Sequence, residues 1–467
     1  GQTIIENSLQ AFGADSDLKH ASISFIVLDA NSGKQIEEYN SNAALPTAST
    51  AKLFSTATAL EILTPDYQPI TRIYTDGHID STGTLIGNLW IRGGGDPSLG
   101  SKYFTSTSTQ YDFLQSWCDQ LEALGIKKIA GAIIADASEF GYNNAPDGWT
   151  WGDMGNYYGA GPSGLTIGDN MMNIKFKTSK YADGQTEIVS INPEVPGLEI
   201  QNNVKSSTSS SDNAYIYGSP YSLDRFVVGT LPMGKSNFIV KGSLPDPENQ
   251  FAHKFLEILA DNNISTNGFK TVRKMNLDSA EKRYIKYTLL VSHKGPKLIE
   301  IINYTNMRSV NLFAEHMLCL VGYEKHGIGT TTAGIKALKQ YWKDKISLTG
   351  FDIRDGSGLS RSNGISAKHY ADLLLAMKGS KFNTAFYNSL PISGVSGTLK
   401  SLNRGQTAHG KIHAKSGTMN RIKSYAGYIE SSSGKTLIFA LIVNNHTCSS
   451  SSIKKKMEPL FNSIARY

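Results

Sequence analysis

The sequence predicts a multi-domain α/β protein in which a central antiparallel sheet, flanked by helices, is interrupted by one or two inserted mainly-β modules. Its 467 residues exceed what one hydrophobic core fills, because single cores stop growing at roughly 250–300 residues. Strand patterns occur near both chain ends, and the long stretch between them changes to short β-like runs separated by Gly, Asn, Asp and Ser. We therefore expect the two chain ends to build one sheet around the insertion.

The N-terminal part contains a strand pair followed by a helix. Ile23–Asp29 and Gln35–Tyr39 are strand-like, and the turn residues at 31–33 between them are a hairpin signal. The stretch LPTASTAKLFSTATAL, residues 45–60, places apolar residues on one helical face, and Pro65 ends the pattern.

The middle of the chain, 71–245, is assigned to the inserted mainly-β region, which we expect to form two nested modules. It includes the serine-rich stretch NNVKSSTSSSDNAY at 202–215, which we expect to be a mobile surface loop. Helical patterns return after residue 246, and the chain closes with two strand-like runs and a terminal helix at 452–467. The outer parts, 1–70 and 246–467, together have a size that suits a single α/β domain.

Composition and charge exclude several function classes. The net charge of +6 is small for this length and the Lys and Arg residues are scattered, so nucleic-acid binding is not expected. No run of about 18 apolar residues is present, and we expect no transmembrane helix. The three cysteines, Cys118, Cys319 and Cys448, lack metal-ligand spacing, so no metal site is expected. They do not indicate whether the protein is in an oxidising or a reducing compartment.

A candidate nucleophile lies near the start of the 45–60 helix. Ser49 and Lys52 are three residues apart, which places the hydroxyl and the amine on one helical face. A serine needs a neighbouring base to take its proton, and a lysine serves if its surroundings lower its pKa. The SxxK pattern alone is weak, because it also occurs by chance at three other serines: Ser16, Ser279 and Ser451.

The second candidate element is an SxN triplet. Ser309-Val310-Asn311 directly precedes a helical pattern, so both polar side chains can point into a cleft, although an N-cap serine with a solvated asparagine is the alternative. The literal SDN at 211–213 falls in the serine-rich stretch and is the weaker candidate.

The third element is the K-[ST]-G triplet at Lys415, before the last strand pair. Lys415 can supply positive charge for a substrate carboxylate, and the hydroxyls of Ser416 and Thr418 can bind it. Gly417 lets a substrate backbone approach closely. On its own, the triplet also fits a lysine before a turn.

The ordered set SxxK, SxN and K[ST]G is the signature of penicillin-binding proteins and serine β-lactamases. Further segments narrow the match: the chain resembles, over nearly its whole length, the D-Ala-D-Ala carboxypeptidases and endopeptidases of the penicillin-binding protein 4 (peptidase S13) family. The segments that carry this resemblance are RGGGDPSL (92–99), DASEF (136–140), WTWGDMGNYYGAGPSGL (149–165), DGSGLSR (355–361) and SGTLK (396–400). Two departures are Val310, where the family has an acidic residue, and Ser416, where it has threonine.

The resemblance implies a β-lactamase/transpeptidase-like domain formed by the outer parts of the chain. It also implies a periplasmic or secreted enzyme that acts on peptidoglycan stem peptides, is acylated by β-lactams and uses neither metal nor cofactor; a homodimer is left open. By resemblance, Ser49 attacks the penultimate D-alanine, with the N–H groups of Ser49 and Thr418 as oxyanion hole. Ser309, held by Asn311 and Lys415, passes a proton to the leaving D-alanine.

Substrate-recognition residues are expected in the insertion and beyond the K-S-G triplet. Asp153 can pair with the amino group of a diaminopimelate stem, with Tyr158, Arg361 and Asn420 around the same pocket. The alternative is that Asp153 is a turn residue and Arg361 a structural ion-pair partner.

Two other functions fit parts of the pattern. A serine β-lactamase or esterase uses the same three motifs, and a catalytically silent peptidoglycan-binding protein would depend on the inserted modules instead. The balance between carboxypeptidase and endopeptidase activity is open, because both reactions share one mechanism.

Overall fold

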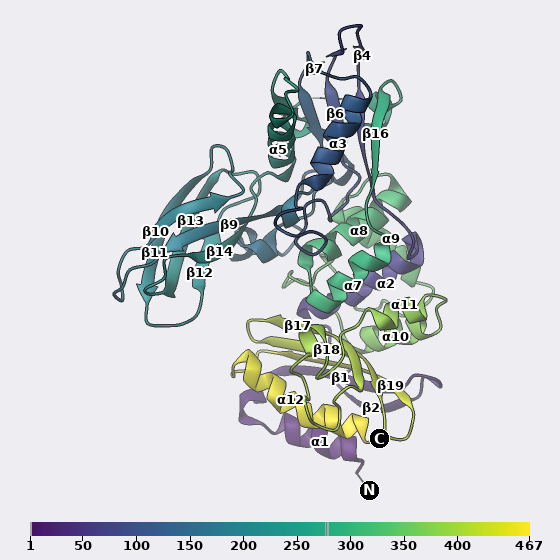
Figure 1. The fold of residues 1–467 in the computed structure, drawn as a ribbon. Helices are drawn as coiled ribbons and strands as arrows, with labels where there is room; N and C mark the ends of the chain where they lie inside the picture. The colour runs from purple at the N-terminus through teal and green to yellow at the C-terminus, as the bar shows by residue number, and fades with distance from the viewer. Residues whose placement is uncertain (1, 276, 278–279) are drawn as a thin grey trace.

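The two chain ends form one five-stranded antiparallel sheet in the computed structural model, which describes residues 2–275, 277 and 280–467 (Figure 1). The strand order is β17-β18-β19-β1-β2, with β17 at one edge. Its strands are β1 (Ser22–Asp29), β2 (Gln35–Tyr39), β17 (Ile412–Met419), β18 (Ile422–Glu430) and β19 (Thr436–Asn444). Strand β1 pairs with β19 from Ser22 opposite Asn444 to Asp29 opposite Leu437, so residues more than 400 positions apart are direct neighbours. The predicted α/β fold class is confirmed in this sheet.

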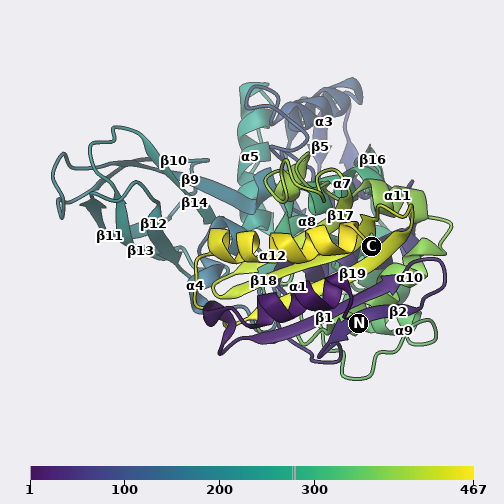
Figure 2. The ribbon, with the colours of Figure 1, turned by 90° about the horizontal axis from the view of Figure 1, so that it is seen from below.

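Helices cover both faces of this sheet, which explains why its strands are apolar without alternation. Phe25 and Val27 enter one core, whereas Ile26 and Leu28 enter the other. Helices α1 (Ile4–Gly13) and α12 (Ser450–Ala465) cover the first face side by side (Figure 2). The helices of the second face are α2 (Lys52–Leu63), α7 (Leu298–Arg308), α8 (Asn311–His326), α9 (Thr331–Trp342), α10 (Ala367–Lys378) and α11 (Asn383–Asn388).

The insertion begins at β3 and has a second hydrophobic core. Its main sheet has the order β15-β8-β6-β3-β16, beside a small sheet β4-β5-β7. The bounds are β3 (Ile70–Thr75), β4 (His78–Ile79), β5 (Thr84–Ile86), β6 (Leu89–Arg92), β7 (Lys128–Ile129), β8 (Ile133–Asp136), β15 (Phe269–Thr271), β16 (Thr288–Lys294), α3 (Asp112–Ala123), α5 (Pro247–Asp261) and α6 (Ala280–Tyr284).

A second set of strands projects to one side of the molecule (Figure 1). It consists of the three-stranded sheets β10-β9-β14 and β11-β13-β12. Its strands are β9 (Met171–Lys177), β10 (Glu187–Asn192), β11 (Glu199–Ser207), β12 (Asn213–Tyr217), β13 (Asp224–Pro232) and β14 (Phe238–Ser243). The expectation of a mobile loop at 202–215 is wrong for most of that stretch: β11 pairs along its whole length with β13, and Val204 and Ser206 are fully buried.

The elements that follow the predicted boundary at 245 share the core and the sheet of the insertion. Helix α5 contributes Phe251 and Phe255 to the second core. Strands β15 and β16 form the two edges of its main sheet. Because these elements share their core and sheet with the insertion, we propose that the inserted region ends with β16, at Lys294.

Short helical segments connect these elements and place several site residues. They are η1 (Ser16–Leu18), η2 (Ala48–Ala51), η3 (Ser138–Phe140), α4 (Trp151–Met154), η4 (Tyr157–Gly159), η5 (Gly168–Asn170), η6 (Val272–Lys274) and η7 (Gly397–Leu399).

Candidate active site

Ser49 lies in the short 3-10 segment η2, directly before α2 begins at Lys52. The preceding residue, Ala48, has a left-handed backbone with φ of 55°, an unfavourable conformation for a residue with a Cβ. This turn leaves Ser49 half-buried at the helix start while Lys52 is fully buried. The Lys52 Nζ donates a hydrogen bond of 2.7 Å to the Ser49 Oγ.

Lys52 is held from three directions. Besides Ser49, its Nζ donates to the Asn311 Oδ1 at 2.7 Å and to the Ser357 carbonyl at 2.9 Å. Burial lowers the pKa of Lys52 to about 7, against the opposing effect of the Asp355 and Glu315 charges. The amine can therefore be neutral near pH 7 and accept a proton from Ser49.

A tight turn behind Lys52 carries the carbonyl of Ser357. Both carboxylate oxygens of the fully buried Glu315 accept N–H groups of this turn, from Gly356 at 2.9 Å and Ser357 at 2.8 Å. Burial raises the pKa of Glu315, and the Asp355 charge adds to the effect. No motif identified Glu315, although its position one helical turn after Asn311 in α8 was an available signal.

Asp355 anchors the same turn. Its carboxylate accepts from the indole of Trp149 at 2.8 Å and from the Ser360 N–H at 2.7 Å. Trp149 belongs to the insertion, so this contact ties the insertion to the turn that supports Lys52.

Ser309 joins α7 to α8 in a left-handed conformation with φ of 57°. Its Oγ accepts a hydrogen bond of 2.9 Å from the Lys415 Nζ, which also donates to the Ser416 carbonyl at 2.8 Å. Ser309 is not the N-cap of α8: Val310 has that position, without a side-chain cap. Burial, with the nearby Lys52 charge, lowers the pKa of Lys415 well below its usual range.

The K-S-G residues lie within edge strand β17, which packs against the nucleophile turn. A Cβ added to Gly417 would lie 2.5 Å from the Thr47 carbonyl oxygen and 2.9 Å from the Ser49 nitrogen. Only glycine permits this approach of the two backbones. The Ser416 Oγ donates to the Thr398 Oγ1 at 2.8 Å, and Thr418 is exposed.

A cavity of about 370 Å³ opens over Ser49. Its lining residues are Ser49, Asp153, Tyr157, Tyr158, Tyr215, Asn311, Gly358, Leu359, Arg361, Thr418, Met419 and Asn420. The four recognition residues expected from the sequence all lie in this set. Tyr215 comes from β12 of the projecting module, and no local motif indicated it.

The four recognition residues differ in their contacts. Asp153 accepts from the Thr150 hydroxyl at 2.7 Å, so it caps α4 as well as facing the cavity. The Tyr158 carbonyl accepts from the Asn311 Nδ2 at 2.9 Å, and burial raises the pKa of its phenol to about 12. Arg361 and Asn420 are exposed at the rim.

The remaining expected patterns do not gather at this site. Of the SDN at 211–213, Ser211 and Asp212 lie between β11 and β12 in the projecting module, and Asn213 is the first residue of β12. Ser16 lies in η1 and Ser451 in α12, whereas Ser279 is outside the described residues. Within the described ranges, no cluster of three His, Cys, Asp or Glu is arranged for a metal ion, and no helix is both long and apolar enough to cross a bilayer.

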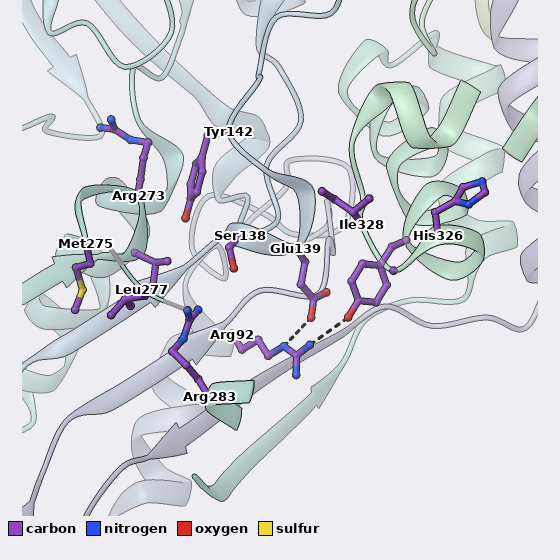
Figure 3. Close-up of a pocket in the computed structure, with 13 residues that line it drawn as sticks. Arg92, Ser138, Glu139, Tyr142, Arg273, Met275, Leu277, Arg283, His326 and Ile328 are labelled. Atoms are coloured by element: carbon purple, nitrogen blue, oxygen red, sulfur yellow. Dashed lines mark hydrogen bonds and ion pairs between the residues drawn. The ribbon is translucent and has the colours of Figure 1, made fainter. Parts of the chain in front are cut away.

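A second, larger cavity of about 570 Å³ lies where the insertion meets the end of α8 (Figure 3). The Arg92 guanidinium in it donates to Glu139 at 2.7 Å and to the Tyr323 hydroxyl at 3.1 Å. Arg273 and Arg283 are likewise paired, with Asp246 and Asp136. The cavity contains no residue of the SxxK, SxN or K-S-G triplets, and its arginines are used in structural ion pairs.

Comparison with known families decides the class of this site. The model of the D-Ala-D-Ala carboxypeptidase 3 (S13) family matches residues 5–466. The chain belongs to this family. Among S13 relatives, it is 26% identical to a D-alanyl-D-alanine carboxypeptidase of Actinomadura sp. (strain R39), over 95% of this chain and 82% of the relative. It is 25% identical to the D-alanyl-D-alanine carboxypeptidase DacB of Haemophilus influenzae, over 94% of this chain and 89% of the relative.

Solved structures share the S13 fold. The crystal structure of penicillin binding protein 4 from Haemophilus influenzae has a TM-score of 0.82 at 21% identity and covers 99% of both chains. The same protein complexed with a β-lactam has a TM-score of 0.78 at 20% identity, over the whole of both chains. The family and the multi-domain fold expected from the motifs are confirmed, and the chain is a serine D-Ala-D-Ala carboxypeptidase of the S13 family.

Proposed function

We propose that this S13 enzyme cleaves the terminal D-Ala-D-Ala bond of peptidoglycan stem peptides through an acyl-enzyme on Ser49, and that β-lactams acylate the same serine. The observation that carries the proposal is the 2.7 Å contact between the Lys52 Nζ and the Ser49 Oγ. It occurs where burial lowers the pKa of Lys52 to about 7. A base with a pKa near the working pH both accepts and returns a proton readily.

In acylation, the Ser49 Oγ attacks the carbonyl of the penultimate D-alanine while Lys52 takes the hydroxyl proton. The developing oxyanion accepts from the N–H groups of Ser49 and Thr418. The close packing at Gly417 supports this assignment, because it holds the β17 backbone against the Ser49 nitrogen. The two N–H groups then need no rearrangement when negative charge develops.

Departure of D-alanine needs a proton on its amine, and Ser309 is our candidate relay. Its hydroxyl gives that proton and takes up in its place the proton that Lys52 received from Ser49, so Lys52 is neutral again for the hydrolysis step. The Ser309 oxygen accepts from Lys415, so its own proton is free to point toward the leaving nitrogen. Asn311 orients the amine of Lys52, because the amide oxygen of Asn311 accepts a hydrogen bond from the Lys52 Nζ. Water entering the vacated space then hydrolyses the acyl-enzyme.

Recognition of the stem peptide is assigned to the cavity over Ser49. The Asp153 carboxylate supplies negative charge for the amino group of a diaminopimelate residue, with Tyr158, Arg361 and Asn420 around it. The same chemistry cleaves cross-linked dimers if the group beyond the scissile bond is accommodated, so we include endopeptidase activity. Such substrates place the enzyme in the periplasm or outside the cell.

The test is digestion of purified muropeptides by the wild type and Ser49→Ala, with free D-alanine and loss of cross-linked dimers as readouts. Ser451→Ala is the matched control, because Ser451 belongs to a chance SxxK pattern on α12. We expect Ser49→Ala to lose both activities and labelling by fluorescent penicillin. A fully active Ser49→Ala enzyme would overturn the nucleophile assignment.

Two further outcomes would favour the alternatives. Rapid turnover of β-lactams, in place of a persistent adduct on Ser49, indicates a β-lactamase. Muropeptide binding without D-alanine release or penicillin labelling indicates a catalytically silent binding protein.

A further inference from the structure

Lys423 is a buried lysine beside the K-S-G strand that no motif identified. It lies on β18 directly opposite Thr418 of β17, with only 7% of its surface exposed. Its Nζ donates a hydrogen bond of 2.7 Å to the Thr418 Oγ1. Thr418 is itself exposed and lines the cavity over Ser49. The Lys423 amine is therefore connected to that cavity through the Thr418 hydroxyl.

The charge of Lys423 is not balanced by a neighbouring carboxylate. Across the described ranges, its Nζ has Thr418 as hydrogen-bond partner, lies 5.2 Å from the centre of the Tyr425 ring and takes part in no ion pair. The groups whose charges couple to it are Lys415 of β17, Lys454 of α12 and His446 after β19, none of which is an anion. Burial lowers the pKa of Lys423 to about 8. Burying a cation without an anion costs free energy, so a bound anion would relieve that cost.

The hydrogen bond also sets the direction of the Thr418 hydroxyl. An ammonium group has only donors, so the Thr418 oxygen is the acceptor in this contact. The hydroxyl proton must then point away from Lys423, and Thr418 has its free side toward the cavity. Thr418 is thus presented as a donor, polarised by a positive charge behind it, which suits an anionic acceptor.

We propose that Lys423 is a positioning residue that, through Thr418, makes the enzyme select substrates whose leaving group carries a free carboxylate beside its amine. The proposal rests on the function proposed above, in which the D-Ala-D-Ala terminus lies across β17. Lys415 supplies positive charge from the Ser309 side of the strand, and Lys423 supplies it from the side that faces α12. The terminal carboxylate would accept from the Thr418 hydroxyl between them.

The experiment compares two thioester substrates that differ only at the end of the leaving group, a carboxylate in one and a carboxamide in the other. Thioesters acylate readily, so turnover of the neutral analogue stays measurable. Wild type, Lys423→Met and Lys423→Arg are assayed, with Lys454→Met as the matched control, since Lys454 bonds to Ser401 at the surface.

We expect Lys423→Met to lower kcat/KM for the carboxylate substrate about 10- to 100-fold, the usual value of a charge-assisted hydrogen bond. Turnover of the carboxamide should stay near the wild-type value, and Lys423→Arg should recover much of the loss. The melting temperature of Lys423→Met should not fall, because the variant loses a buried charge that has no anionic partner among the described residues. Lys454→Met should match the wild type with both substrates.

Equal losses with the two substrates, or a loss that parallels a lower melting temperature, would overturn the role of Lys423. That outcome leaves the proposed function standing if the wild type still releases D-alanine in a Ser49-dependent way. Failure of the wild type to release D-alanine would instead refute the proposed function, whatever Lys423 does.

Discussion

Substitution of Gly417 by alanine should disable acylation although it adds only a methyl group. The added Cβ would lie 2.5 Å from the Thr47 carbonyl oxygen and 2.9 Å from the Ser49 nitrogen, and both atoms belong to the backbone. Ordinary contacts of a Cβ begin at 3.4 Å, so strand β17 and the nucleophile turn must separate by about 0.9 Å. The third close atom, the Ser424 Oγ, can rotate away, but the backbone atoms cannot.

This separation moves the Thr418 N–H away from the Ser49 N–H, and it moves Lys415 away from Ser309. A misplacement near 1 Å costs about 100-fold in rate, so we expect kcat/KM for acylation to fall by about that factor. Overpacking should also lower the free energy of unfolding by about 1–3 kcal/mol.

The assay for Gly417→Ala is the rate of labelling by a fluorescent penicillin, measured together with thermal unfolding. Gly13→Ala is the matched control, because a Cβ at Gly13 would meet no atom within 4 Å. Wild-type labelling by Gly417→Ala would refute the reasoning, since it would mean that β17 can retreat from Ser49 without affecting the oxyanion hole.

Four other predictions concern the charges around the site. Acylation of Ser49 should fall as the pH drops below about 7, where Lys52 becomes protonated and cannot accept a proton. Lys52→Met should lower the acylation rate about 10²- to 10⁴-fold above pH 7 and remove the acidic limb of the rate profile, as measured by stopped-flow labelling. Asp355→Asn removes a charge that raises the pKa of Lys52, so the acidic limb of the rate profile should move to lower pH; an unmoved limb would contradict this coupling. Asp153→Ala should reduce turnover of diaminopimelate-containing peptides more than that of simpler D-Ala-D-Ala peptides, and equal effects in a parallel D-alanine release assay would argue for its capping role alone.

The motif positions could be predicted from sequence because the chemistry demands particular residue types over short spacings. Ser49 needs a base on the same helical face, and Lys52 satisfies that requirement locally. The contact between Lys415 and Ser309 joins residues 106 positions apart, and a separation of that length does not predict a contact. Only the shared order of the three motifs indicated that these residues converge.

Support groups were harder to predict because their value depends on distant partners. Glu315 in a helix pattern is indistinguishable from a surface glutamate until its carboxylate is seen to hold the turn at Ser357. Lys423 looks like a polar residue in a strand until Thr418 is placed opposite it. The sequence contains the residue type, and the fold supplies the partner.

The end of the insertion, which we propose to lie at Lys294 and not at 245, was hard to predict for a related reason. The apolar pattern of α5 predicts a helix with one buried face, but it does not say which core receives that face. Phe251 and Phe255 enter the insertion core because β15, which follows α5, pairs with β8. The pairing of β15 with β8 therefore decides which core α5 joins, because the apolar pattern of α5 alone fits either core.

The three buried lysines of the active site differ in whether carboxylates compensate their charge, and this difference suits the proposed reaction. Glu315 and Asp355 lie behind Lys52, and their charges act against the burial that lowers its pKa. The amines nearer the substrate-binding strand, Lys415 and Lys423, have no such carboxylates among the causes of their pKa shifts. In the proposed reaction an anionic terminus is therefore attracted to β17 rather than to Lys52, whose charge is partly compensated, and burial keeps the pKa of Lys52 low enough for it to act as a base.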